Sequence, residues 1–288
     1  MRPAADETSP AIHLDRVCVR YHVPREVVAS LKEYAIRRLS GRVGHDEFVG
    51  LRDVSLVIRA GERVGIIGGN GAGKSTLLRV IARVRRPTEG RVVVRGRVAP
   101  LLELGLGFHA ELTGRENVIL QGTLLGLSRC EMVARMPSIT AFAEIEGFLD
   151  APIRNYSTGM SARLAFAVAT DVDPDVLLVD EALAVGDERF KARCHERMNQ
   201  FRERGKTFLL VSHSLEEVVE TCQRAVWIAD GRVMRDGPAR EVCREYLEWS
   251  RSGGPPPAGE VRESAPPPER TEGPPGAHGI PHRTTLPG

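Results

Sequence analysis

The chain has 288 residues, 42% of them apolar, which is enough to bury the core of one large domain. Its 40 basic and 38 acidic residues leave a net charge of +2, too small to indicate nucleic acid as the main partner. Residues 1–10 are polar and no run of about eighteen apolar residues occurs, so we expect neither a secretory signal nor a membrane-spanning helix.

The cysteines are scattered, odd in number and never spaced as Cys-x-x-Cys, which favours reduced thiols over a disulfide framework or a zinc site. Cys194 is followed by His195, but adjacent residues point apart on a helix. We therefore do not expect these two side chains to share a metal.

Short apolar segments in the first part of the chain predict strands over residues 12–21, 54–58, 63–67 and 91–94. Turns that contain glycine, such as Ala60-Gly61-Glu62, separate them and favour an antiparallel β layer. An insertion at about residues 24–41 separates the first two strands. Its apolar residues recur at helical spacing among arginines and a lysine, which predicts a basic amphipathic helix over Pro24–Leu39.

Two later segments open with capping boxes, at Thr113–Glu116 and Ser128–Glu131, and predict a helical subdomain over about residues 109–158. The apolar runs Val176–Val179 and Thr207–Val211 are typical of buried strands, and each precedes a helix-like segment. Together with residues 63–67 they predict a parallel sheet.

These elements predict one α/β domain over about residues 1–250, with a mixed or parallel sheet core, an antiparallel β layer and a helical subdomain. Residues 251–288 are rich in proline and glycine and nearly free of large apolar side chains, so we expect them to form a disordered tail.

A phosphate-binding loop is predicted between the strand at 63–67 and an apolar helix over 76–84. The loop matches G-x-x-x-x-G-K-[ST] with Gly68, Gly69, Asn70, Gly71, Ala72, Gly73, Lys74 and Ser75, and Thr76 completes the expected ATP contacts. Backbone N–H groups and the helix N-terminus favour phosphate oxygens. We expect Lys74 to contact the outer phosphates and the Ser75 hydroxyl to bind Mg²⁺.

Two further strands end in residues suited to hydrolysis. The strand at 176–179 is followed by Asp180 and Glu181, which we assign to the Mg²⁺ shell and to the general base. His213 follows the strand at 208–211, where an imidazole can hydrogen-bond the γ-phosphate and the attacking water. It is the second predicted catalytic residue.

With these motifs in this order, residues 11–250 resemble the ABC ATPase family. The family's signature, commonly Leu-Ser-Gly-Gly-Gln, is matched at Ser157 and Gly159, whereas Thr158 and Met160 depart from it. The resemblance implies a mixed α/β cassette that binds ATP and Mg²⁺. It also implies a head-to-tail homodimer in which the signature of one subunit closes on the ATP of the other.

The same resemblance implies roles for four more residues. Asp187 matches the aspartate loop and would contact the other subunit. Glu103 is the nearest candidate for the glutamine that contacts Mg²⁺ in the family, and Tyr21 would stack on adenine, with Phe48 as the alternative.

Three stretches are similar to the subfamily that powers export of lipid-linked polysaccharides such as O-antigen, capsule and teichoic acid. They are Tyr156–Met160, Leu102–Asn117 and Asp180–Asp187. This similarity implies a peripheral ATPase subunit on the cytoplasmic face of the inner membrane, working with a separately encoded integral-membrane permease and without nucleic acid.

The insertion at 24–41 also occurs in that subfamily. We hypothesise that it gates entry of the lipid-linked substrate, and an ordinary surface helix is the alternative. Two other functions stay open at this point, which are the ATPase of an ABC transporter for another substrate and a soluble ABC ATPase without a transport role.

Overall fold

A six-stranded sheet forms the centre of the computed structural model, which describes residues 10–24, 45–101, 107–180 and 187–254. The strand order is β5-β6-β7-β3-β8-β9, and every pair is parallel except the last. The strands are β3 (Arg63–Ile67), β5 (Val98–Leu101), β6 (Val176–Asp180), β7 (Thr207–Val211), β8 (Arg224–Ala229) and β9 (Arg232–Pro238). The predicted parallel sheet is confirmed.

A second, antiparallel sheet has the order β2-β1-β4, with β1 (Pro10–Pro24), β2 (His45–Arg59) and β4 (Glu89–Val94). The strands β1 and β2 are longer than predicted, because their pairing continues from Pro10 opposite Arg59 to Pro24 opposite His45. Pro24 therefore ends a strand and does not begin a helix. The rest of the basic helix expected over 24–39 lies outside the described residues.

The strand β3 was expected in both the antiparallel layer and the parallel sheet, and it belongs only to the latter. The turn before it carries the chain from one sheet to the other. Residues of β7 hold this turn, since Thr207 Oγ1 accepts a hydrogen bond from the Gly61 N–H at 3.0 Å and the Phe208 N–H donates to the Glu62 carbonyl at 2.9 Å. A glycine turn alone does not specify which strand pairs with which.

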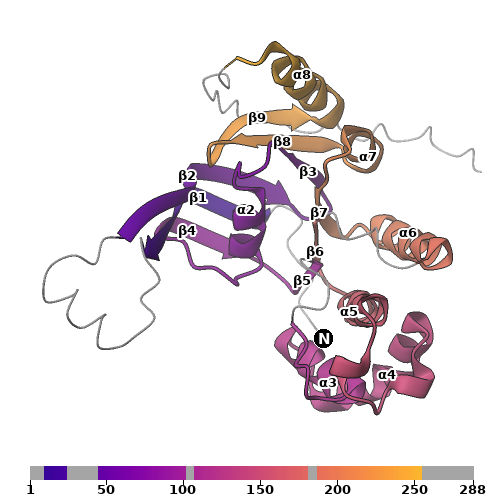
Figure 1. Ribbon diagram of the computed structural model, residues 1–288. Coiled ribbons are helices and arrows are strands. Elements are labelled where there is room, and N and C mark those ends of the chain that lie inside the picture. The colour runs from indigo at the N-terminus through magenta and orange to yellow at the C-terminus, as the bar shows by residue number, and fades with distance from the viewer. Residues whose placement is uncertain (1–9, 25–44, 102–106, 181–186, 255–288) are drawn as a thin grey trace, which may run out of the picture.

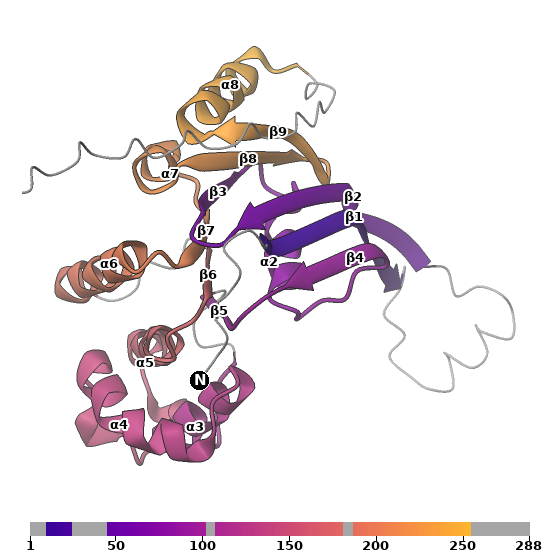
Figure 2. The same ribbon diagram turned by 180° about the vertical axis from the view of Figure 1, so that it is seen from behind.

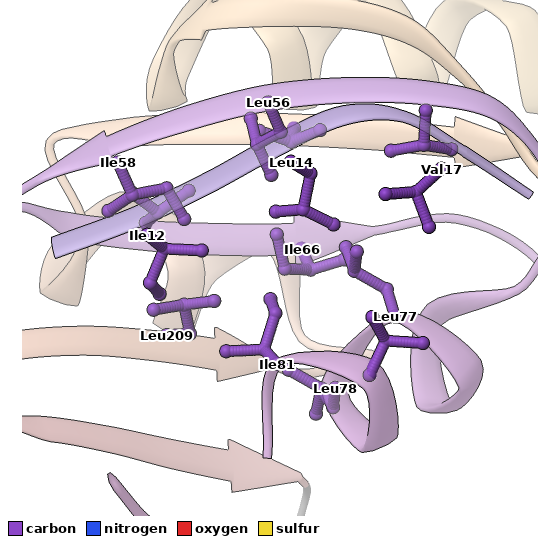
Figure 3. Packing of buried hydrophobic residues seen from close by; sticks show 14 of the residues in the cluster. Ile12, Leu14, Val17, Leu56, Ile58, Ile66, Leu77, Leu78, Ile81 and Leu209 are labelled. Carbon is purple, nitrogen blue, oxygen red and sulfur yellow. The ribbon is translucent and has the colours of Figure 1, made fainter. Parts of the chain in front are cut away.

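The core has two parts because alternate residues of the central strands point to opposite faces of the sheet. On β6 and β7, Leu178 and Leu209 belong to a cluster with the antiparallel sheet and α2 (Lys74–Ile81), whereas Leu177 and Leu210 belong to a cluster with helices on the other face. Figure 3 shows the first cluster, in which side chains from β1, β2, β3 and α2 meet. The helix α2 ends earlier than the expected residue 84.

Helices α6 (Glu188–Glu203), α7 (Leu215–Thr221) and α8 (Ala239–Ser252) lie along the opposite face of the sheet (Figures 1 and 2). α8 continues to Ser252, just past the expected domain boundary at residue 250, and Gly253 ends it with a φ of 64°. Of the predicted tail, all residues beyond 254 lie outside the described ranges.

Helices α3 (Gly114–Leu124), α4 (Arg129–Ala143) and α5 (Thr158–Asp171) form a separate lobe (Figure 1). The helical subdomain was expected over about residues 109–158, and α5 extends the lobe beyond that end. Two short 3₁₀ turns, Glu146–Phe148 and Ile153–Asn155, connect α4 to α5. Both capping boxes are confirmed, since the Thr113 and Ser128 side chains accept from the third N–H of their helices and the matching glutamates reach back. α5 continues from this lobe toward the sheet.

The elements β5, β8, β9 and α8 were not predicted from the sequence. For β8 and β9 a local pattern was available, because the apolar run Ala225–Ala229 is followed by Asp230-Gly231, a dipeptide typical of two-residue hairpin turns. Both residues have positive φ, 49° and 73°, as such a turn requires.

The first testable prediction concerns the central sheet. Val64→Ala removes methyl groups from a side chain that is 0% exposed and should lower the free energy of unfolding by about 2 kcal/mol, through lost burial and the cavity left behind. Val57→Ala, on β2, makes the same chemical change at a side chain that is 44% exposed and should stay within about 0.5 kcal/mol of wild type. Urea denaturation followed by tryptophan fluorescence measures both, and equal losses would contradict this account of the core.

Candidate functional site

The loop between β3 and α2 lies close against other backbone segments. A Cβ at Gly68 would sit 2.1 Å from the Ile228 carbonyl oxygen, and one at Gly73 would sit 2.6 Å from the Gly50 carbonyl oxygen. Their φ values of 149° and 110° also lie in the range that disfavours residues with a Cβ. Glycine is therefore required at both positions for the loop to lie between β8 and β2.

Lys74 lies inside this loop and is 7% exposed. Its ammonium group donates to the carbonyl oxygens of Gly68 at 2.8 Å and Gly69 at 3.0 Å, so the loop curls around the positive charge. No side chain caps the N-terminus of α2, and a Cβ added at Gly69 or Gly71 would meet no heavy atom within 4 Å. Uncapped N–H groups, a fixed cation and free space beside the backbone suit a phosphate group.

The parallel register brings the other predicted residues to the same edge of the sheet. β7 lies between β6 and β3, and Val211 pairs with Asp180 on one side and Ile66 on the other. Asp180 and the residues just after Ile66 and Val211 therefore leave the sheet side by side. The phosphate loop, a carboxylate and His213 meet at this edge, as expected for parallel strands.

Hydrogen bonds fix the segment that carries His213. The Ser212 hydroxyl donates to Glu217 Oε2 at 2.6 Å and accepts from the Ser214 N–H at 3.0 Å. Ser214 in turn caps α7 by accepting from the Glu217 N–H at 3.2 Å. The sequence analysis missed Glu217, although it stands three residues after a serine at the start of a helix, a signal for such a cap.

Two of the predicted catalytic and metal-binding residues lie outside the described part of the chain. They are Glu181, the expected general base, and Glu103, the candidate for contact with Mg²⁺. Asp180 and Ser75 are described, and both stand at the edge where the phosphate loop lies. Carboxylate and hydroxyl oxygens are ligands that Mg²⁺ prefers, so these two residues fit such an ion.

The candidate adenine-binding aromatics lie beside α2. The Tyr21 hydroxyl is 3.3 Å from Thr76 Oγ1, in the first turn of the helix, and its ring centroid is 6.2 Å from that of Phe48. Phe48 is 55% exposed, whereas Tyr21 is partly buried. The Arg85 guanidinium lies 4.6 Å over the Tyr21 ring, a cation–π contact that the sequence analysis missed.

The signature residues lie in the helical lobe, at the N-terminus of α5. Ser157 caps this helix, its Oγ accepting from the Met160 N–H at 3.1 Å, and both Ser157 and Thr158 are exposed. The preceding Tyr156 donates to the Phe148 carbonyl at 2.7 Å. The chain thus presents a second helix N-terminus, in a different lobe from the phosphate loop (Figures 1 and 2).

Asp187 has a defined structural role. Its Oδ1 accepts from the Phe190 N–H at 2.8 Å and so caps α6, and its side chain is exposed. The carboxylate also stabilises the helix dipole. Residues 181–186, which connect Asp187 to β6, lie outside the described ranges.

All of the cysteines lie among the described residues, where they are free thiols. Burial raises the pKa of the Cys194 thiol to about 12, so it stays protonated at neutral pH. In the same part of the chain no group of three or more His, Cys, Asp or Glu side chains is arranged to hold a metal ion. No helix among the described residues is both long and apolar enough to span a bilayer.

Comparison with known proteins gives one family match and several close relatives. Residues 51–184 match the family model described as ABC transporter. The O-antigen export system ATP-binding protein RfbB of Klebsiella pneumoniae is 44% identical over 245 residues, which cover 83% of this chain and 98% of the relative.

Two other relatives are longer than this chain. RfbB of Myxococcus xanthus is 50% identical over 198 residues, covering 69% of this chain and 45% of the relative. The teichoic acids export ATP-binding protein TagH of Listeria monocytogenes is 43% identical over 202 residues, covering 70% of this chain and 60% of the relative. The chain therefore spans only about half of the length of these two proteins.

Among solved structures, a dimeric bacterial ABC transporter cassette superposes with a TM-score of 0.61 at 25% identity, covering 80% of this chain and 99% of that one. A post-hydrolysis cassette bound to ADP and phosphate superposes with the same TM-score of 0.61, at 24% identity. The predicted fold class is confirmed.

The second prediction tests the phosphate loop. Lys74→Ala should weaken binding of a fluorescent ATP analogue by about tenfold or more, since a hydrogen bond from a charged group contributes about 1.5–3 kcal/mol. Lys191→Ala removes a lysine that pairs only locally, with Glu188 at 2.7 Å, and should leave the affinity unchanged. Unaltered binding by the Lys74 variant would rule out this loop as the phosphate site.

Proposed function

This chain belongs to the ABC transporter family, and we propose that it is the ATP-hydrolysing subunit of an exporter that moves a lipid-linked polysaccharide across the inner membrane. The observation that carries the proposal is the match to RfbB of Klebsiella pneumoniae, an O-antigen export protein that this chain covers almost from end to end. The teichoic acid export protein among the relatives points to the same class of cargo.

ATP is the proposed nucleotide, held by the loop at residues 68–76. The N–H groups at the start of α2 and the Lys74 ammonium would bind its phosphates, and Tyr21 would stack on adenine. Ser75 and Asp180 would hold Mg²⁺, with Glu103 as a further candidate. The ion neutralises charge on the outer phosphates when bound.

Hydrolysis requires a residue that orients and deprotonates the attacking water. We assign this role to Glu181, which directly follows Asp180 in the sequence, and a supporting role to His213, which lies just after the neighbouring strand β7. Hydrogen bonds made by Ser212 and Ser214 hold the backbone on either side of His213.

The proposed working unit is a head-to-tail homodimer. Ser157 and Thr158 at the N-terminus of α5 and Asp187 at that of α6 are exposed. In the dimer the α5 end would meet the ATP held by the phosphate loop of the other subunit, and Asp187 would contact that subunit. One chain therefore contributes to two half-sites.

A separately encoded permease is the proposed membrane partner, with this subunit bound peripherally on the cytoplasmic face. The substrate-gating role hypothesised for residues 24–41 concerns residues outside the described ranges, apart from Pro24. It stays a hypothesis, and a deletion of this segment that left export intact would remove it.

The third prediction tests the general base. Glu181→Gln should lower the rate of Mg²⁺-dependent ATP hydrolysis by about 100-fold or more and trap an ATP-bound dimer, because the variant binds ATP without activating water. Light scattering in ATP reports the dimer. Glu203→Gln alters an exposed carboxylate at the opposite end of α6 and should hydrolyse ATP normally. Normal turnover by a monomeric Glu181→Gln protein would refute both the base and the dimer.

The fourth prediction separates the two roles of Ser157. Ser157→Asp keeps a good helix cap, so the thermal stability of the isolated subunit should not change. The added negative charge should repel the partner's nucleotide and lower ATP hydrolysis by about tenfold or more. Ser128→Asp makes the same change at the cap of α4 and should leave hydrolysis unaltered. If both variants hydrolyse ATP like wild type, the signature does not face a nucleotide.

The fifth prediction tests the cargo. In proteoliposomes that contain this subunit and its permease, a lipid-linked polysaccharide should raise ATP hydrolysis above the basal rate. An amphiphile without sugars, at the same concentration, should not. Stimulation by the amphiphile alone would instead favour a transporter for another substrate.

A further inference from the structure

The C-terminal end of α4 is joined to two other helices through one residue, Glu144. This residue follows the last turn of α4 in a left-handed conformation, with φ 56° and ψ 50°. Its Oε1 accepts from Arg193 of α6 at 2.5 Å, and its Oε2 lies 3.5 Å from Arg163 of α5. The residue that ends α4 therefore contacts α5 and α6 through one carboxylate.

The two arginines occupy equivalent positions on their helices. Arg163 is six residues after Ser157, the cap of α5, and Arg193 is six residues after Asp187, the cap of α6. At about 1.5 Å per residue, each arginine lies about 9 Å along its helix from the capped end. Glu144 thus contacts both helices at the same distance from the ends that we assign to the partner subunit.

Aromatic packing supports the same junction. The rings of Phe142 on α4, Phe166 on α5 and Phe190 on α6 lie within 5.6–6.1 Å of one another. Arg193 and Arg197 lie 4.7 and 4.5 Å over the Phe142 ring. Packed rings resist small shifts of one helix against another.

The charged groups at the junction form a network and are not isolated surface ion pairs. Arg193 also donates to the Ala141 carbonyl at 3.3 Å, in the last turn of α4, where carbonyl groups lack helical partners and the dipole is negative. Isolated exposed ion pairs contribute little, but here one carboxylate and two arginines form a network that is less than half exposed.

We propose that Glu144 is a positioning residue that sets the spacing between the signature end of α5, which would close on the nucleotide of the partner subunit, and the Asp187 end of α6, which would contact that subunit. The proposal rests on the head-to-tail dimer proposed above. Glu144 itself would touch no nucleotide. Its loss would weaken closure of the dimer and leave ATP binding by the single subunit intact.

The test uses the full chain with Glu181→Gln, which should dimerise in ATP. Adding Glu144→Gln removes the charge with little change of shape, and should raise the dissociation constant of the ATP-bound dimer about tenfold. Sedimentation velocity measures the dimer. Affinity for a fluorescent ATP analogue, measured at concentrations where the protein is monomeric, should not change. In the chain that retains Glu181, Glu144→Gln should lower kcat at saturating ATP.

Glu111→Gln is the matched control, because Glu111 pairs with Arg154 on the surface of the same lobe. It should alter neither the dissociation constant of the dimer nor kcat. If Glu144→Gln does not fold, Arg163→Gln tests the same interaction from the other side. It should also raise the dissociation constant of the ATP-bound dimer. Equal dimer affinities for the parent and the Glu144→Gln or Arg163→Gln protein would overturn the proposal. Failure of the Glu181→Gln parent to dimerise in ATP would overturn the dimer itself, and this inference with it.

Discussion

The position of the phosphate loop depends on a close approach of backbone segments that only glycine permits. Gly68 lies against the carbonyl of β8 and Gly73 against that of Gly50, so the loop is enclosed between the two sheets. Gly231 completes the contact, since its N–H donates to the Ala72 carbonyl at 2.9 Å and its carbonyl accepts from the Arg52 N–H at 2.7 Å. The turn between β8 and β9 thereby joins the loop to the antiparallel sheet.

The central position of β7 has an equally direct consequence for the chemistry. Because β7 pairs with β3 on one side and β6 on the other, the three segments that follow these strands emerge together. A loop suited to phosphate, a carboxylate suited to Mg²⁺ and an imidazole are brought to one edge by the strand order alone. The buried strands behind them hold this edge rigid, since alternate side chains pack into different cores on the two faces of the sheet.

The helix N-termini in this chain serve two purposes. At Ser157 and Asp187 an exposed side chain caps the helix, at the two ends proposed to face the partner subunit. At Lys74 no side chain provides a cap, which suits phosphate bound within the same chain. Glu144 joins α5 and α6, so the two exposed ends are held by one junction in the helical lobe.

The sequence by itself determined whatever is encoded locally. The motif at 68–75, the capping boxes at Thr113 and Ser128 and the apolar runs of β6 and β7 each depend on near neighbours along the chain, so the phosphate loop, the helical lobe and the parallel sheet were predictable. The roles proposed for Glu181 and Glu103 concern residues outside the described ranges. Tertiary structure alone decided which sheet β3 joins, how far β1 and β2 pair, and that Arg85 meets Tyr21 and Glu144 meets two arginines. These contacts join residues far apart in sequence, and no local pattern records them, because their energy comes from packing that exists only once the chain has folded.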